Sequence, residues 1–363
     1  MPGASAIRSS SQQRALSSLQ LAAQAYAGAA LATSSAASYR RHVRYFVRFM
    51  GANQLSAYVL AGHPLHMSLY VSFLAETVSH SSILTYLKGV KALYTRLGLA
   101  DPFRDPGVQR VLAGIKRCNG AAPSQQKLPI QPWMLVQWAE FLRIAESDFG
   151  LAVFTAMVFA FFGFFRKSTV AVAPRRAGEE LDDRVERRVL RRSDIRVDLA
   201  NDCVRVTQHW SKTIQARERT HEVPLAGCRG SVLDPVSLYS LLLQRIPAPD
   251  SAHAFSYPRR GRLVPLTHGV FVATVKRLAA QSGLSAADFA GKSFRRGGAS
   301  FAFASGVRGE LIQSHGDWRS DAYLVYLELA DADRLSTSRA MQASLAALAF
   351  SGAGAVAASQ GAA

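Results

Sequence analysis

The sequence contains few cysteines: three in 363 residues, namely Cys118, Cys203 and Cys228. Their number is odd, and none stands in a CxxC or Cys/His spacing. The chain therefore lacks the pattern of a disulfide framework or of a structural zinc site. Thiols of this kind are typical of proteins kept in a reducing compartment, so we expect an intracellular protein that holds no metal.

Long apolar runs are missing as well. The most apolar run, Leu151–Phe165, has 15 residues, which is short of the ~20 needed to cross a bilayer. It is bounded by Asp148 and by Arg166 and Lys167, so we predict a buried core helix. The N-terminus shows no compact apolar stretch followed by a cleavage site, and a secretory signal is not expected. The sequence thus predicts no membrane-spanning segment.

Acidic residues are outnumbered by basic ones. Lys and Arg number 43 against 25 Asp and Glu, which gives a formal net charge of +18 and a pI near 10.4. A surplus of this size favours polyanions through counterion release and electrostatic steering. Charge alone leaves open a merely soluble basic protein or contact with anionic lipid. No basic amphipathic helix with an aromatic face stands apart from the domains, however, so we expect a nucleic acid as the partner.

The length and a hydrophobic content of 49% predict two domains, each with its own core. We expect a partly disordered segment that can hold a helix (1–33), a helical domain (34–118) and a second domain (130–350). The stretch 119–129 is rich in small residues, Pro and Gln and predicts a linker. The low-complexity tail, 351–363, is expected to be disordered.

Two helices of the first domain combine an apolar face with a basic one. Within SYRRHVRYFVRFM the apolar positions at helical spacing are Tyr39, Val43, Phe46, Val47 and Met50. In a second helix, Ser82–Leu97, the core side holds Ile83, Tyr86, Leu87, Val90, Leu93, Tyr94 and Leu97. The opposite faces carry Arg40, Arg41, Arg44, Arg48, Lys88, Lys91 and Arg96. A solvated basic surface is the ordinary alternative, but two such faces in one small domain favour contact with DNA backbone.

The second domain is predicted to be mainly α-helical with a small antiparallel β-sheet. Helices are expected at about Gln131–Ala145, at Asp148–Phe165, and from Thr267 as N-cap to Ser282. Three short strands are expected at roughly Val189–Val197, Cys203–Gln208 and Thr220–Leu225, with a short extended stretch around Ala254–Tyr257. The segment 174–192 mixes both charges and predicts a solvated loop.

Five scattered residues have the side chains that metal-free cleavage of a phosphodiester requires: Arg166, Lys212, Arg295, Trp318 and Tyr326. They stand in the contexts FFGFFRKSTV, HWSKTIQARERTHEVPL, KSFRRGGAS and HGDWRSDAYLVYL. A tyrosine oxygen can attack phosphorus and keep the strand as a covalent ester. Two arginines can hold the non-bridging oxygens, where charge develops in the transition state. A lysine can hand a proton to the departing sugar oxygen, and an indole N–H can donate to phosphate without titrating.

The order, spacing and context of these residues resemble those of the tyrosine recombinases (phage-integrase family) over roughly residues 34–345. KSFRRGGAS is similar to the corresponding box of eukaryotic Crypton-like and DIRS-like mobile elements. SSILTYLKGVKALYTRLGL resembles a helix of the family's SAM-like core-binding domain. The resemblance implies that Arg166 and Arg295 are the catalytic arginines, Lys212 the general acid, Trp318 a phosphate donor and Tyr326 the nucleophile.

Two positions depart from the family pattern. Lys292 stands where a histidine is usual. A lysine can donate to a phosphate oxygen but is a poor base at neutral pH unless its pKa is lowered, so we expect a phosphate contact. Thr169 stands where the family has an acid, three residues after Arg166. Arg296, next to Arg295, is expected to support the site or to contact DNA backbone.

Tyr323 is the rival of Tyr326, because it lies three residues earlier on a neighbouring part of the same face. The interval from Trp318 favours Tyr326, and Tyr323 is expected to pack. His315 is expected to be structural or to bind DNA backbone. A further helix is predicted at Ala332–Phe350, which either docks onto a neighbouring protomer, as the family's C-terminal segment can, or packs against its own chain.

The resemblance implies a site-specific DNA recombinase or integrase. Tyr326 would form a 3′-phosphotyrosyl link and release a 5′ hydroxyl, and strands would be rejoined without ATP, metal or another cofactor. The partner implied is double-stranded DNA, bound by a homotetramer. The two departures keep a catalytically inactive, domesticated DNA-binding protein as an alternative, and a topoisomerase-like enzyme shares the tyrosine chemistry. In a eukaryote the protein would act in the nucleus.

Overall fold

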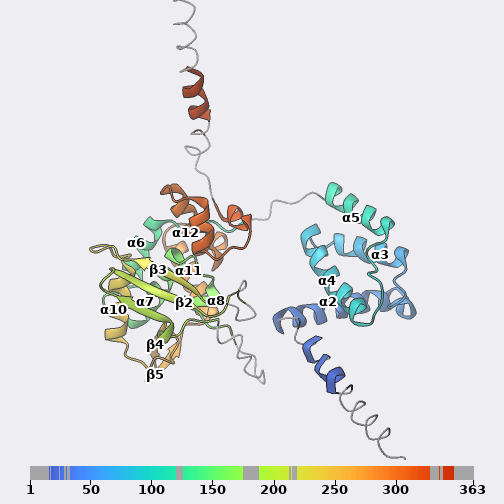
Figure 1. The fold of residues 1–363 in the computed structure, drawn as a ribbon, viewed down its shortest axis with the longest axis horizontal. Coiled ribbons are helices and arrows are strands. Elements are labelled where there is room, and N and C mark those ends of the chain that lie inside the picture. Colours follow the sequence, from blue (N-terminus) through green and yellow to red (C-terminus); the bar gives the residue numbers. More distant parts are fainter. Residues whose placement is uncertain are drawn as a thin grey trace, which may run out of the picture. The chain divides into compact units, whose positions relative to one another are not determined.

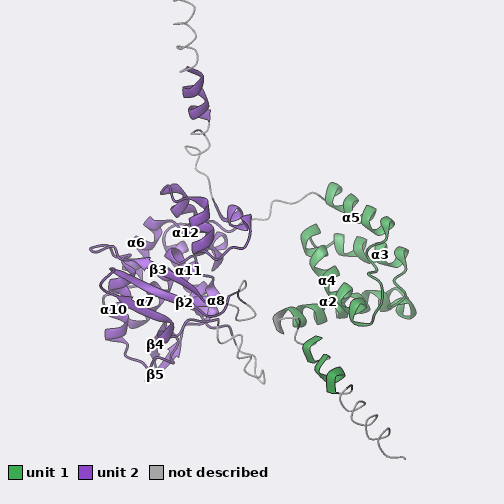
Figure 2. Cartoon of the chain, in the orientation of Figure 1, with its two compact units in different colours: residues 1–125 green, residues 126–363 purple. Residues whose placement is uncertain are grey.

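A computed structural model describes residues 33–119, 126–174, 188–211, 214, 219–327 and 338–346, with residue 335 and a few positions between 16 and 30. The chain divides into two compact units, Met1–Gln125 and Gln126–Ala363 (Figure 2). The mostly helical architecture with small antiparallel sheets confirms the predicted fold class (Figure 1). None of the helices in the described ranges is long and apolar enough to cross a membrane. The segments predicted at 1–33, 119–129, 174–192 and 351–363 lie wholly or partly outside the described residues.

The first unit is a set of helices around one apolar cluster. In chain order its elements are α2 (Thr33–Ala52), η1 (Ser56–Tyr58), α3 (Pro64–Ala75), α4 (His80–Arg96) and α5 (Pro106–Cys118). Helix α5 begins at Asp105, whose carboxylate accepts hydrogen bonds from the N–H groups of Gly107 and Val108. Pro106 follows at the first helical position, where its fixed φ suits the helix and its missing N–H is not needed. The core includes Phe46, Met50, Met67, Tyr70, Ile83 and Val90.

Helices α2 and α4 approach closely because Gly89 has no side chain. A Cβ at that position would lie 2.7 Å from the Cβ of His42, whose ring stacks on Tyr86 at a centroid distance of 4.5 Å. Two of the predicted core positions are wrong, since Val47 is 44% exposed and Leu97 48%. The buried stripe of α2 runs through His42, Phe46, Phe49 and Met50. This stripe turns Val47 outwards, and Leu97 lies beyond the last residue of α4.

The basic residues predicted on these helices are all exposed, as expected: Arg40, Arg41, Arg44, Arg48, Lys88, Lys91 and Arg96. Lys91 forms an ion pair with Asp101 at 2.6 Å. The four arginines of α2 have no carboxylate partner among the described residues of the chain. Their charges are therefore available to an anionic partner, whereas that of Lys91 is partly compensated.

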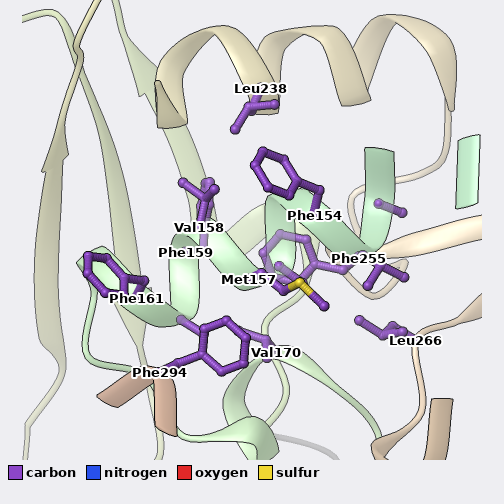
Figure 3. Packing of buried hydrophobic residues seen from close by; sticks show 14 of the residues in the cluster. Phe154, Met157, Val158, Phe159, Phe161, Val170, Leu238, Phe255, Leu266 and Phe294 are labelled. Carbon is purple, nitrogen blue, oxygen red and sulfur yellow. The ribbon is translucent and has the colours of Figure 1, made fainter. Parts of the chain in front are cut away.

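The second unit is packed around α7 (Asp148–Phe162), which is buried from Gly150 to Phe161. Ser147 caps its first turn by accepting from the N–H of Gly150. Figure 3 shows α7 side chains meeting residues of distant segments, among them Leu238, Phe255, Leu266 and Phe294. The other helices are α6 (Pro132–Phe141), α8 (Lys167–Val170), α10 (Pro235–Arg245), α11 (His268–Gln281), η3 (Ala286–Asp288), α12 (Lys292–Ala304), α13 (Gly309–His315) and η4 (Asp321–Tyr326).

A three-stranded antiparallel sheet follows the short helix η2 (Arg192–Asp194). Its strands, in spatial order, are β1 (Ile195–Asp198), β2 (Cys203–Gln208) and β3 (His221–Ala226). Alternate side chains are buried, including Val204, Val206, Val223 and Leu225. On the other face Arg205 spans the sheet, with ion pairs to Asp198 at 2.9 Å and Glu222 at 2.8 Å. A separate hairpin pairs β4 (Ser256–Arg259) with β5 (Arg262–Pro265).

Several sequence predictions can be compared with these bounds. Strand Cys203–Gln208 and the N-cap Thr267 are confirmed, and the Thr267 side chain accepts from the N–H of Val270. The strand predicted at Val189–Val197 is wrong in its first half, because residues there form η2 before β1 begins. The sequence does not predict β5. Tyr326 is the last residue of the 3-10 helix η4, for which Ser320 is the N-cap.

Candidate active site

Arg295 lies in the first turns of α12, in the segment RRGG, and the two glycines explain its position. A Cβ at Gly297 would lie 2.1 Å from the carbonyl oxygen of Ile130, and one at Gly298 would lie 2.0 Å from that of Phe161. Any larger residue would push α12 away from the end of α7. The glycines therefore let α12 press Arg295 into the interior, where it is only 4% exposed.

The Arg295 guanidinium is fixed by two backbone carbonyls. Its Nη1 donates to the oxygen of Phe164 at 2.6 Å, and its Nη2 donates to that of Gly316 at 2.6 Å. Phe164 has a φ of 49°, a left-handed conformation between α7 and α8. No described carboxylate forms an ion pair with Arg295. The buried cation therefore has hydrogen-bond acceptors but no neutralising anion in direct contact.

Trp318 and Tyr326 lie beside this guanidinium. The Arg295 Cζ is 3.8 Å from the centroid of the Trp318 ring system and 5.7 Å from that of the Tyr326 ring. The two aromatic centroids are 5.4 Å apart. Ser300 on α12 donates to the carbonyl oxygen of Tyr326 at 3.0 Å, which ties η4 to the helix that carries Arg295. The structure thus brings together three residues that the sequence places up to 31 positions apart.

Tyr323, the rival tyrosine, has a different environment. Its hydroxyl lies against the start of α13, so that a Cβ at Gly309 would be 2.6 Å from the Tyr323 Oη. Its ring centroid is 6.3 Å from that of Trp318. Both tyrosines are half-buried, but only Tyr326 lies near Arg295 in a cation–π arrangement. This difference favours Tyr326 over Tyr323.

Arg166 is half-buried and is the N-cap residue that immediately precedes α8. The sequence places it at the end of a continuous helix, but α7 ends at Phe162 and three residues separate the two. Its charge reaches the site, since burial first and then the positive charge of Arg166 lower the pKa of Arg295. Two cations close enough to repel each other form a site that a phosphate would stabilise.

Two N–H groups at the centre of the site have no partner among the residues that the structure describes. The Nε of Arg295 and the Nε1 of Trp318 are both buried and neither is hydrogen-bonded. A buried donor without an acceptor costs roughly 1–3 kcal/mol, so such groups are rare unless a ligand satisfies them. We call this pair of donors the anion site.

The remaining predicted residues are placed unequally. Lys292 is exposed at the first position of α12, one turn before Arg295. Lys212 lies outside the described residues. Arg296 donates to the Oε1 of Gln126 at 2.6 Å and to the carbonyl of Lys127 at 3.3 Å. Arg296 is turned about 100° around α12 from Arg295, so the two side chains lie on different sides of the helix. Arg296 thus binds the first residues of the second unit.

His315 is a structural histidine in this arrangement. Its Nε2 lies 2.8 Å from the carbonyl oxygen of Phe162. Burial lowers its pKa, and the nearby His221 and Arg295 lower it further, against the opposing hydrogen bond to Phe162. A neutral ring that donates to a carbonyl suits a structural role. His221, on β3, contacts the carbonyl of His315 in turn at 3.1 Å.

Asp317 is the residue that the sequence analysis misses. It is 8% exposed and has a φ of 54°. Its carboxylate accepts from the Oγ of Ser211 at 2.9 Å and pairs with the guanidinium of Arg219. Its position in the turn-forming sequence HGDW is the only signal that could have indicated it. Within the described ranges, no cluster of His, Cys, Asp or Glu is placed to hold a metal ion.

Comparison with known proteins identifies the fold. No protein-family model matches the sequence, and no curated protein matches it. Among solved structures, the Tn1549 transposon integrase in complex with transposon right end DNA matches with a TM-score of 0.57 and 14% identity, over 88% of this chain and 98% of that one. The same integrase with a circular intermediate DNA matches with a TM-score of 0.50 and 13% identity, over 84% and 99%. The chain therefore has the fold of an integrase of the tyrosine recombinase type.

Proposed function

We propose that this protein is a DNA strand transferase, a recombinase or integrase that cleaves and rejoins DNA through Tyr326. The observation that carries the proposal is the anion site: two unpaired buried donors, Arg295 Nε and Trp318 Nε1, beside a tyrosine ring. The Arg295 Cζ lies 3.8 Å from the centroid of the Trp318 ring, so the two donors belong to groups in direct contact, which suits a phosphate bound by both. The fold supports the same function.

The chemistry follows from the roles of the residues. The Oη of Tyr326 attacks phosphorus, and the bond from phosphorus to the 5′ oxygen breaks, leaving a 3′-phosphotyrosyl ester. Arg295, Trp318 and Arg166 stabilise the charge on the non-bridging oxygens, and Lys292 contacts the phosphate. Lys212 gives its proton to the departing 5′ oxygen. The phenol proton leaves to solvent, which half-buried Tyr326 contacts. The ester conserves the bond energy, so the reverse attack by a 5′ hydroxyl needs neither ATP nor metal.

The first unit would supply affinity for the duplex. The exposed arginines of α2 and the cations of α4 are suited to phosphate contacts that position the protein without reading sequence. Exchange between two duplexes needs four cleavages, so a tetramer of protomers on DNA is part of the proposal. The resemblance to Crypton-like and DIRS-like elements stays a prediction.

A nicked suicide substrate tests the proposal. Cleavage beside the nick releases a short fragment, rejoining is prevented, and a covalent protein–DNA adduct accumulates on a denaturing gel. We expect an adduct from the wild type, none from Tyr326→Phe, and an adduct from the matched control Tyr323→Phe. An adduct that persists in Tyr326→Phe would refute the assignment of the nucleophile.

The same experiment separates the alternatives. DNA binding by the wild type without any adduct would identify an inactive DNA-binding protein instead. Relaxation of supercoiled plasmid without recombined products would identify a topoisomerase-like activity.

A further inference from the structure

Asp317 combines two unfavourable features. Its backbone is in the left-handed region, with a φ of 54°, and its carboxylate is 8% exposed. Aspartate tolerates positive φ better than most residues, yet such a conformation is still uncommon. Burying a charged carboxylate is costly unless it is paired. Residues with a strained backbone persist only where the surrounding structure enforces that conformation, and they cluster at functional sites.

The main chain on either side of Asp317 holds the anion site. The preceding residue, Gly316, accepts a hydrogen bond from Arg295 through its carbonyl. The following residue, Trp318, stacks on the same guanidinium. Asp317 therefore joins, in the chain, the residue whose carbonyl binds Arg295 and the residue whose indole supplies a donor.

The side chain of Asp317 points to a different element, the connection between β2 and β3. Ser211, three residues beyond the end of β2, donates to one carboxylate oxygen, and Arg219, two residues before β3, pairs with the other. The two anchor points bracket residues 212–218, which begin with Lys212. One carboxylate thus holds both ends of the segment that contains the predicted general acid.

Further contacts fix the same ends. The N–H of Ile214 donates to the Oγ of Ser211 at 3.2 Å, and the Ile214 side chain is fully buried. At the other end, the Nε2 of His221 contacts the carbonyl of His315 at 3.1 Å. The connection between α13 and η4 is therefore bonded to the β2–β3 connection through His315 and Asp317.

We propose that Asp317 is a positioning residue, which holds Ser211 and Arg219 beside the anion site and so supports proton transfer from Lys212, the residue after Ser211, to the departing 5′ oxygen. This inference rests on the proposed function. Lys212 is covalently bonded to Ser211, so an anchor on Ser211 limits the volume that the lysine can sample. A misplacement of about 1 Å can cost on the order of 100-fold in rate. Asp317 would then support both the general acid and the phosphate donors.

The rival explanation is that Asp317 acts only through Arg295, near which it lies. The two explanations differ in what a change of leaving group does. A 5′ alkoxide needs a proton as it departs, whereas a 5′ thiolate does not, because a thiol has a pKa of about 8.5. A substrate with a bridging 5′ sulfur therefore removes the need for Lys212 but not the need for Arg295.

The experiment measures adduct formation on two nicked suicide substrates, one with the ordinary 5′ oxygen and one with a bridging 5′ sulfur. We expect Asp317→Ala to slow cleavage of the oxygen substrate by about 10- to 100-fold and to cleave the sulfur substrate at the wild-type rate, as Lys212→Ala should. Asp317→Asn keeps the size and the tolerance of positive φ, and can still accept from Ser211. It should lie between the wild type and Asp317→Ala, and it is the second variant if Asp317→Ala does not fold.

Three controls make the result decisive. Arg295→Ala should be slow on both substrates. Asp198→Asn, which removes a carboxylate partner of Arg205 on the same sheet, should match the wild type on both. Thermal melting and DNA affinity confirm that each variant is folded and binds.

Equal slowing of the Asp317 variants on both substrates would overturn the inference, and so would unchanged cleavage of the oxygen substrate. A wild type that forms no adduct on either substrate would overturn the proposed function itself, and this inference with it.

Discussion

The guanidinium of Arg295 and the arginines of α2 carry the same charge in opposite environments. Arg295 is 4% exposed, is held by two carbonyls and lies against an indole ring. The arginines of α2 are exposed and have no carboxylate partner among the described residues. A mobile surface cation is already solvated, so its main effect on DNA is the release of counterions. A fixed, desolvated cation interacts more strongly with charge that develops beside it.

This comparison separates affinity from catalysis within one basic protein. Net charge alone describes both units in the same way, although among the described residues only the second unit holds a buried arginine, as at Arg295. If the comparison is right, substitutions at the buried site change the rate of cleavage on bound DNA, and substitutions on α2 change the binding and its dependence on salt.

The largest effect is expected for Arg295. Loss of one preorganised donor to a developing charge costs about 100- to 1,000-fold in rate, so Arg295→Ala should slow adduct formation by about 1,000-fold or more. Arg295→Lys keeps the charge but not the planar fork, and we expect a loss of roughly 100-fold. The measurement is single-turnover adduct formation at saturating DNA. A near-wild-type rate for Arg295→Lys would show that charge alone suffices and would remove the distinction drawn above.

Trp318→Phe should have the next largest effect. The change keeps a ring against the guanidinium and removes only the unpaired Nε1–H. A hydrogen bond to a charged group contributes about 1.5–3 kcal/mol, so cleavage should slow by about 10- to 100-fold. Trp210→Phe is the matched control, because Trp210 also stacks on a guanidinium, that of Arg188 at 3.7 Å. Equal rates for Trp318→Phe and the wild type would mean that the indole N–H does not contact the phosphate.

A moderate effect, on binding only, is expected for the α2 arginines. The double change Arg44→Ala and Arg48→Ala should weaken DNA binding and reduce the slope of log K against log salt by about 1.8, at about 0.9 for each phosphate that the protein no longer neutralises. Cleavage at saturating DNA should be unchanged. Lys91→Ala provides the internal comparison, because Lys91 is already paired with Asp101 and should change the slope less. Binding titrations at several salt concentrations would measure both, and an equal slope change would contradict this.

The sequence was sufficient where a local pattern has a single structural solution. The apolar run that became α7, the alternation of Cys203–Gln208 and the cap at Thr267 were all predicted within a few residues. A run too apolar to be exposed and too short to span a membrane has to be a core element. An N-cap needs only its own side chain and the next turn.

Predictions failed where tertiary contacts decide. Nothing local shows that Phe49 rather than Val47 is buried; Phe49 packs against Tyr70 and Phe73 of α3. Strand β5 was missed because Arg259 to Arg262 looks like a polar loop, although Arg260 and Gly261 both adopt positive φ and close a two-residue hairpin.

At the site, Arg295, Trp318 and Tyr326 were selected from their contexts, and the structure brings them together. The role of Asp317 depends on Ser211 and Arg219, about 100 residues earlier in the chain, and no local rule joins them.

The smallest effect concerns pH and His315. Burial lowers the pKa of His315 below its ordinary value of 6.5, so the unfolded chain binds a proton more readily than the folded protein. Stability from this group is therefore fully present above pH 6.5 and is lost as the pH falls towards the folded-state pKa. At pH 5.5 the penalty cannot exceed about 1.4 kcal/mol per histidine. His315→Gln, whose amide can still donate to the carbonyl of Phe162, should reduce the loss of stability between pH 7.5 and 5.5.

Denaturant unfolding at the two pH values measures this difference. The same measurement can compare the acid sensitivity of the two units. His42 in the first unit is also buried, and burial and then the charge of Arg41 lower its pKa. His42→Gln should therefore reduce acid sensitivity in the transition of the first unit, and His315→Gln in that of the second. At pH 7.5 neither variant should be more stable than the wild type, because both histidines are then neutral in the folded and unfolded states. A gain in stability at pH 7.5 equal to that at pH 5.5 would show that the substitution acts through packing and not through proton binding.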